Sequence, residues 1–193
     1  MEKLFKRLFK KEKRQKDKGD VDVHCNVAGN PNNSDRRKDP RLEDTRLNAA
    51  KDPKTSSETL ASLASDKSWT VCCRVAGNPN ASPETLAMLA KDVNEDVRKA
   101  VAENPSATPE ILASLAKDES WGVRKAVAEN PSATPEILAS LAEDEIWYVR
   151  REVAGNRNTP RKILALLARD EEKYVRNTAK CNPNTPKKFR KSS

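Results

Sequence analysis

The chain has 193 residues, of which 34% are charged and only 4% aromatic, and its formal net charge is +8. A hydrophobic fraction of 36% is low for a large globular core, and no apolar run approaches the ~20 residues that a membrane helix needs. Four cysteines are too few for a disulfide scaffold, no secretory signal is present, and one histidine leaves little for acid–base catalysis.

The first segment, residues 1–20, is a basic leader with nine basic and four acidic side chains, a net charge of +5. If it is helical, Leu4, Phe5, Leu8 and Phe9 share one face, and lysines and arginines fill the other side. Such a helix can lie on an anionic membrane surface, so these four residues are a candidate for weak membrane contact. The alternative is a disordered, solvated tail.

Residues 21–44 resemble a degenerate N-terminal copy, or cap, of the repeat that follows them. The segment VHCNVAGNPN at 23–32 has the repeat's composition, but it lies only 22 residues before its successor. The polar segment Ser34–Asp44 stands where the helix of this copy is expected.

Residues 45–182 are a tandem repeat with a period of 26 residues, present in about five copies. Residues 97–122 and 123–148 are identical at 23 of 26 positions. Equivalent positions in successive copies are called a column below, and the valine column comprises Val71, Val97, Val123, Val149 and Val175. The basic tail, residues 183–193, continues a last copy that remains unfinished.

Each copy contains two short helical patterns and no alternating strand pattern, which predicts an all-α fold. Thr108 can cap the first helix, Pro109 suits its first turn, and Glu110 lies at the positive end of its dipole. The second helix starts near Val123 and must end before Pro131. Helices of about 7–10 residues are too short to be stable alone, so the copies must stack on one another.

With the pattern V-R-x-x-V-A-x-N-P-x-T-P-E-x-L-x-x-L-A-x-D, the chain closely resembles the leucine-rich repeat variant family. The resemblance covers residues 45–176 well and 23–44 poorly. It implies a right-handed, HEAT-like α-solenoid in which α-helices alternate with shorter 3₁₀-like helices. Periodicity alone leaves paired α-helices equally open.

Some members of this family carry an N-terminal iron–sulfur domain with clustered cysteines, and this chain departs from that pattern. Only Cys25 precedes the repeats, beside His24, whereas Cys72, Cys73 and Cys181 lie within them without any C-x-x-C spacing. We therefore expect no metal, cluster or other cofactor, and free thiols that suit a reducing cytoplasm. A nucleophilic pair of His24 and Cys25 lacks an orienting third group.

Four polar columns have structural explanations. The aspartates end the first helix and are expected to pair with arginines of their own or a neighbouring repeat. The asparagines are expected to form hydrogen bonds with backbone groups of the loops, and the glutamates to interact favourably with the helix dipoles. They comprise Asp66, Asp92, Asp118, Asp144 and Asp170; Arg98, Arg124, Arg150 and Arg176; Asn78, Asn104, Asn130, Asn156 and Asn182; and Glu58, Glu84, Glu110 and Glu136.

Two adjacent columns concentrate the aromatic residues. The tryptophan column also contains Glu95 and Lys173, and a position that accepts charged side chains cannot be fully dry. We therefore expect these rings to be partly exposed and treat them as candidate anchors for a protein partner. The candidates are Trp69, Trp121, Trp147, Tyr148 and Tyr174. The alternative is that each ring folds onto its neighbouring loop.

The positive charge is concentrated at the two ends of the chain. Residues 21–148 hold 15 basic and 21 acidic side chains, a net charge of −6, whereas residues 149–193 hold 13 basic and four acidic, a net charge of +9. The C-terminal part is a candidate anion-binding face for nucleic acid, although basic tails are commonly only solubilising. The candidate residues are Arg150, Arg151, Arg157, Arg161, Lys162, Lys187 and Lys188.

These observations predict a cytoplasmic, non-enzymatic helical-repeat scaffold that binds a protein partner. The alternative is a binder of anionic surfaces, nucleic acid or the periphery of a membrane, that uses the basic ends. An enzyme is disfavoured because every recurring polar residue has a structural role, and no nucleophile–base pair or metal-ligand set is left over.

Overall fold

The computed structural model describes residues 40–190, and this part of the chain is all-helical, without β-strands. Its helices alternate in length along the chain. The longer helices are α2 (Pro40–Lys51), α4 (Trp69–Ala76), α6 (Glu95–Glu103), α8 (Trp121–Glu129), α10 (Trp147–Gly155) and α12 (Lys173–Cys181). The seven-residue helices are α3 (Ser57–Leu63), α5 (Pro83–Leu89), α7 (Pro109–Leu115), α9 (Pro135–Leu141) and α11 (Arg161–Leu167), and a 3₁₀ turn, η1 (Lys187–Phe189), follows α12.

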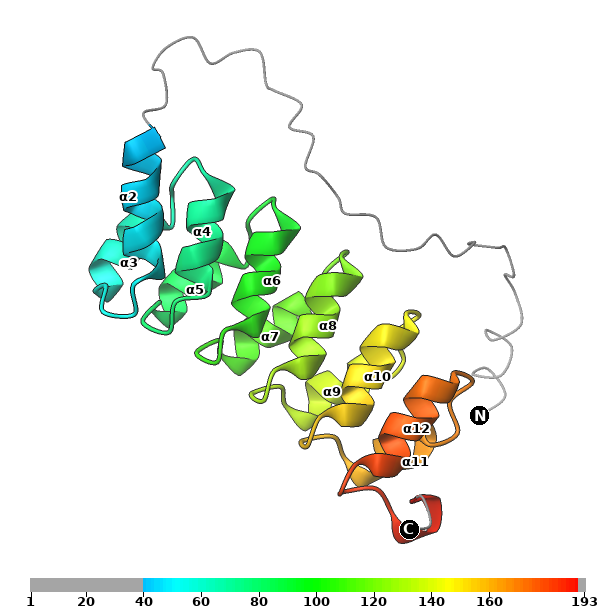
Figure 1. Cartoon of the computed structure of the whole chain (residues 1–193). Coiled ribbons are helices and arrows are strands. Elements are labelled where there is room, and N and C mark those ends of the chain that lie inside the picture. Colours follow the sequence, from blue (N-terminus) through cyan, green and yellow to red (C-terminus); the bar gives the residue numbers. More distant parts are fainter. Residues whose placement is uncertain (1–39, 191–193) are drawn as a thin grey trace, which may run out of the picture. The chain divides into compact units, whose positions relative to one another are not determined.

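The helices stack in chain order as a helical-repeat solenoid, with the longer helices in one row and the seven-residue helices in the other (Figure 1). Each longer helix packs against the next longer helix, and each seven-residue helix contacts the longer helices before and after it. The predicted all-α solenoid is therefore confirmed. Both helices of each described repeat are α-helices, and the 3₁₀ geometry within residues 40–190 is confined to η1.

Local sequence explains where the seven-residue helices begin. Thr134 caps α9, since its hydroxyl accepts a hydrogen bond from the backbone N–H of Ile137 at 3.4 Å, and Pro135 follows as the first helical residue. Glu136 lies in the first turn, where the hydroxyl of Thr134 and the backbone N–H lower its pKa. Helix α11 differs, because its N-cap residue is Pro160, which makes no side-chain cap.

The core is a continuous layer of aliphatic side chains that runs through the stack. Val123 and Val127 of α8 and Leu138 of α9 are completely buried, and their counterparts in the neighbouring repeats are buried as well. Full burial of such a side chain contributes roughly 1.5–3 kcal/mol, so helices too short to persist alone are held by their neighbours.

The asparagine column joins each repeat to the one before it. The side-chain amide of Asn130 donates to the backbone oxygens of Ala102 and Asn104 at 2.7 and 3.1 Å, and its oxygen accepts from the N–H of Ser132. The same bonds recur at Asn78, Asn104, Asn156 and Asn182. The expected structural role of this column is confirmed.

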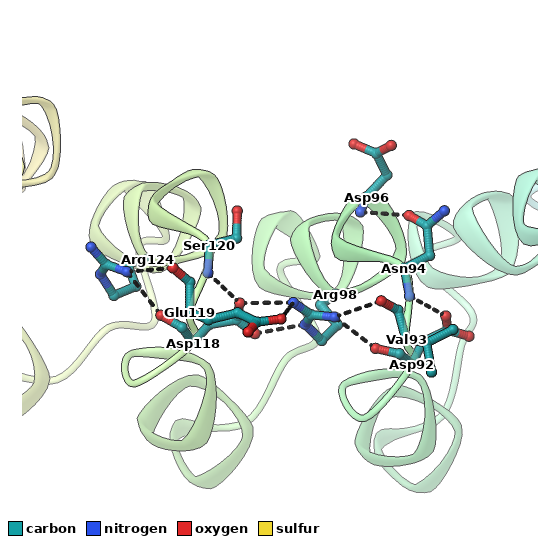
Figure 2. A network of polar contacts seen from close by, with 9 residues as sticks. All are labelled: Asp92, Val93, Asn94, Asp96, Arg98, Asp118, Glu119, Ser120 and Arg124. Atoms are coloured by element: carbon teal, nitrogen blue, oxygen red, sulfur yellow. Dashed lines mark hydrogen bonds and ion pairs between the residues drawn. The ribbon is translucent and has the colours of Figure 1, made fainter. Parts of the chain in front are cut away.

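When each repeat is counted from a seven-residue helix through the longer helix that follows it, the arginine and aspartate columns form a second ladder whose pairs cross to the next repeat. Arg98 binds Asp118 through its Nε and Nη2 atoms at 2.7 and 3.0 Å, and its Nη1 donates to the carbonyl oxygens of Asp92 and Val93 (Figure 2). Asp118 in turn accepts from the backbone N–H of Ser120. The equivalent pairs are Arg46–Asp66, Arg124–Asp144 and Arg150–Asp170.

One prediction about the N-terminal cap needs adjustment. Helix α2 begins at Pro40, so the last part of the segment Ser34–Asp44 is helical and does not interrupt the stack. The leader residues Leu4, Phe5, Leu8 and Phe9, and the pair His24 and Cys25, lie outside the described residues.

Candidate functional site

A row of four aromatic rings crosses three successive repeats. Tyr148 lies between Trp121 of α8, with ring centroids 5.8 Å apart, and Trp147 of its own helix, with centroids 3.7 Å apart. Trp147 also stacks on Tyr174 of α12 at 5.4 Å. Four of the five candidate partner-binding residues thus form one contiguous surface, called the aromatic row below.

The rings of the aromatic row are accessible from solvent. Trp121 is 48% exposed, Tyr148 41% and Tyr174 60%, whereas Trp147 is half-buried against the core. The expectation of partly exposed rings is therefore confirmed, and the alternative of rings folded onto separate loops does not describe this row. Its role in binding stays a prediction.

The aromatic row is flanked by charged groups of both signs. The guanidinium carbon of Arg151 lies 5.8 Å from the ring centre of Trp147 and 5.6 Å from that of Tyr148, and Arg151 also pairs with Glu152. The loops that precede α8 and α10 place the exposed Glu119 and Glu145 two positions before the tryptophans. Arg151, predicted as part of an anion-binding face, is thus a member of the aromatic surface.

Trp69 is separate from the aromatic row. It occupies the same column at the start of α4 and is 43% exposed, but Glu95 occupies the column in the intervening repeat. Within residues 40–190 no ring contact joins Trp69 to another aromatic residue. It therefore offers an isolated ring where the row offers four.

The polar columns are engaged in holding the stack together. The carboxylates that accept their hydrogen bonds raise the pKa values of Arg98, Arg124 and Arg150. Burial alone would raise the pKa of Asp118, but hydrogen bonds from Arg98 and Ser120 outweigh it and lower the pKa. These groups are kept charged by each other, which is the behaviour of a structural ladder.

Two of the described thiols, Cys72 and Cys73, are poorly suited to nucleophilic chemistry. Burial, followed by the charges of Asp92 and Asp66, raises the pKa of Cys72. Burial, followed by the charge of Asp96, raises the pKa of Cys73 to about 11. A thiol with such a pKa has very little thiolate at neutral pH.

The basic candidates of the C-terminal part do not form a single face. Arg150 is buried, 8% exposed, and its guanidinium is bound to Asp170, so its assignment to an exposed anion-binding face is wrong. Arg157 is exposed in the loop between α10 and α11, whereas Lys187 is exposed in η1.

Arg161, Lys162 and Lys188 do come together, at a cleft of about 340 Å³ between α11 and η1. The cleft is also lined by residues that were not among the sequence candidates. These are Ala165, Leu166, Arg169, Pro186 and Phe189. The sequence does indicate that Leu166 is unusual, because the two preceding copies hold Ser114 and Ser140 at the same position.

Two further observations bear on the kind of site that the described residues can form. Within residues 40–190 no three side chains of His, Cys, Asp or Glu are grouped so as to hold a metal ion. In the same region no helix combines the length and hydropathy required to span a bilayer.

The comparisons with known proteins match this geometry. Residues 73–126 match the model of the Leucine Rich Repeat Variant domain. A solved structure described as a leucine-rich repeat variant with a novel repetitive protein structural motif is similar at a TM-score of 0.54 and 26% sequence identity. The match covers 73% of this chain and 61% of that one, so the chain spans less than two thirds of its relative's length.

No curated protein matches the chain. The matched domain model lies within the stacked copies, and the solved relative shares their helical-repeat fold. The repeats of this chain are therefore similar to leucine-rich repeat variants, in sequence over residues 73–126 and in their helical-repeat fold.

Proposed function

We propose that this protein is a cytoplasmic, non-enzymatic scaffold that binds a protein partner through the aromatic row. The observation that carries the proposal is the unbroken series of ring contacts from Trp121 through Tyr148 and Trp147 to Tyr174, and three of these rings are exposed. Tryptophan, tyrosine and arginine are the residues most enriched among the anchors of protein interfaces. A solenoid also presents an extended surface of the kind that repeat proteins use for binding.

The construction of the row favours binding because it is preorganised. The rings start helices whose valines, such as Val123 and Val149, are completely buried. Each ring also leans on its neighbour, which limits the rotamers that a partner would have to immobilise. Ordering side chains on association costs about 0.5–1.5 kcal/mol each, so rings that are already ordered leave more net affinity.

A protein partner suits the row better than nucleic acid does. Glu119 and Glu145 lie on the loops two positions before the tryptophans, and the Glu119 side chain is 90% exposed although its carboxylate lies 3.6 Å from Nη2 of Arg98. A polyanion would be repelled there, because phosphates require neutralising cations. A protein segment with apolar and basic side chains would be complementary to these groups.

The described thiols also fit the proposed compartment. Cys72, Cys73 and Cys181 are free, and the first two are adjacent in one helix. Free thiols persist in a reducing cytoplasm, whereas oxidising compartments favour disulfides.

The test is affinity capture from the native cell, with nuclease and salt controls, followed by a measured dissociation constant for the captured protein. The double substitution Trp121→Ala and Tyr148→Ala is expected to weaken binding by at least about thirtyfold. Trp69→Ala is the matched control, since it removes an exposed ring from the same column but outside the row.

Both variants must retain the helical circular dichroism and urea midpoint of the parent chain, so that lost binding reports the surface alone. The proposal fails if the partner binds the double variant and the Trp69→Ala variant equally well.

A further inference from the structure

We propose that the cleft between α11 and η1 is a second docking site, which holds a short acidic peptide segment of another protein by an apolar side chain and flanking carboxylates. This site is independent of the aromatic row, because its lining residues include none of the four stacked rings.

The lining combines apolar and cationic side chains. Ala165, Leu166, Pro186 and Phe189 supply the apolar surface, and Leu166 is 68% exposed. Arg161, Lys162, Arg169 and Lys188 supply the charge, and no carboxylate is among the lining residues. Among the described large apolar residues Leu166 is second only to Val93 in exposure, so the cleft leaves unusual apolar surface uncovered.

The cleft is built from departures from the repeat pattern. Lys162 stands in the glutamate column, and Leu166 stands where the two preceding copies hold Ser114 and Ser140, although Met88 occupies that column in an earlier copy. Arg169 follows Lys91 and Lys117 in a column where only Glu143 is acidic, so it keeps the usual charge. The first of these changes opposes the helix dipole, and α11 also lacks the side-chain cap that α9 has.

The lysine and the missing side-chain cap disfavour the start of α11, and Lys162, Leu166 and Arg169 all line one surface. Selection for helix stability alone would disfavour Lys162. Binding of an anionic, partly apolar group accounts for Lys162 and Leu166 together.

A peptide fits this surface better than nucleic acid or a membrane. The ring of Phe189 lies 5.0 Å from both the guanidinium of Arg169 and the ammonium group of Lys188, so cations already occupy the ring that a base would stack on. A depression of about 340 Å³ is within the size range of small ligand pockets and can accept a large side chain. Membrane-surface segments bury a broad apolar face, whereas this surface has one strongly exposed leucine among four cations.

The test measures fluorescence anisotropy of a labelled peptide on the full chain. The peptide has a central leucine–phenylalanine pair with three acidic residues on each side, and its controls replace the apolar pair by alanines or the acids by amides. An oligouridine RNA and vesicles of phosphatidylcholine with phosphatidylserine are the competing probes.

The repeat itself supplies variants that should fold. Lys162→Glu with Arg169→Glu, and separately Leu166→Ser, install the residues that the preceding copy holds at the same positions. The matched control is Lys91→Glu with Lys117→Glu, which makes the same change in charge at exposed positions of the Arg169 column, away from the cleft.

We expect the Lys162→Glu, Arg169→Glu variant to weaken peptide binding by about tenfold or more, and Leu166→Ser to weaken it by a comparable factor. The charge-matched control should bind like the parent chain. Both control peptides should bind more weakly than the parent peptide.

The proposal is overturned if the cleft variant and its charge-matched control lose the same affinity, or if the alanine-centred peptide binds as well as the parent peptide. It is also overturned if RNA or vesicles, rather than the peptide, show binding that depends on Lys162, Leu166 and Arg169.

Discussion

Arg124 of one repeat holds Asp144 of the next through two parallel hydrogen bonds, from Nε at 2.6 Å and from Nη2 at 3.1 Å. The remaining Nη1 donates to the carbonyl oxygens of Asp118 and Glu119 in its own repeat. The Arg124 guanidinium therefore joins the loop that precedes its own helix, α8, to the carboxylate of Asp144 in the loop that follows α9. The side chains are only 13% and 6% exposed, so this pair is well shielded from water.

Replacing Arg124 by glutamine should lower the free energy of unfolding by about 3 kcal/mol, because it leaves a shielded carboxylate without its cation. Urea denaturation measures the effect. Lys99→Gln serves as the control, since its pair with Glu103 is exposed and 3.8 Å long, and it should cost less than about 0.5 kcal/mol. Equal losses of unfolding free energy in the two variants would show that the shielded pair stabilises the fold no more than an exposed pair does.

The ladder has one gap, at Cys72. This residue occupies the arginine column, and its thiol contacts the carbonyl oxygen of Asp66 at 3.4 Å. Within residues 40–190 no ion pair joins Asp92 to the preceding repeat. Cys72→Arg should restore the pair and raise stability by about 1–2 kcal/mol, as restoring a consensus residue commonly does.

A double-mutant cycle checks this prediction by thermal or urea denaturation. The gain from Cys72→Arg should disappear when Asp92→Asn is also present, since the two groups are expected to interact directly. A gain that survives Asp92→Asn would mean that the arginine stabilises the helix by some other contact.

The asparagine column should tolerate substitution far less than the neighbouring polar residues do. Asn130 is buried and makes three hydrogen bonds, so Asn130→Ala should cost about 3 kcal/mol by leaving loop groups of two repeats unsatisfied. Asn158 is exposed and bonds the oxygen of Pro131, so Asn158→Ala should cost less than about 1 kcal/mol. Comparable losses at the two sites, measured by urea denaturation, would contradict the assigned role.

Acid should weaken the stack through Asp118. The folded pKa of Asp118 lies below its ordinary value of about 3.9, so its contribution is complete above that pH and is lost as the pH falls through the folded pKa. We therefore expect the urea midpoint to fall steeply below about pH 4. Asp118→Asn should be less stable at neutral pH and should show a shallower acid dependence. An unchanged slope in this variant would exclude Asp118 as a contributor.

Much of this architecture follows from the sequence by itself, because a repeat of 26 residues places equivalent side chains in the same environment in every copy. The cap at Thr134, the buried column that contains Val123, and the extended Asn130 ahead of Pro131 all follow from one copy. The partial exposure of the tryptophans follows too, since a column that holds Glu95 cannot be dry.

Only the tertiary structure decides what neighbouring repeats do to one another. Whether an aspartate pairs within its repeat or with the preceding one depends on the rotation between copies, and that rotation also buries Arg150 against Asp170. The packing between copies also places Leu166 and Phe189 in the lining of one cleft. Periodicity specifies each unit, whereas the packing angle between units determines which surfaces those units share.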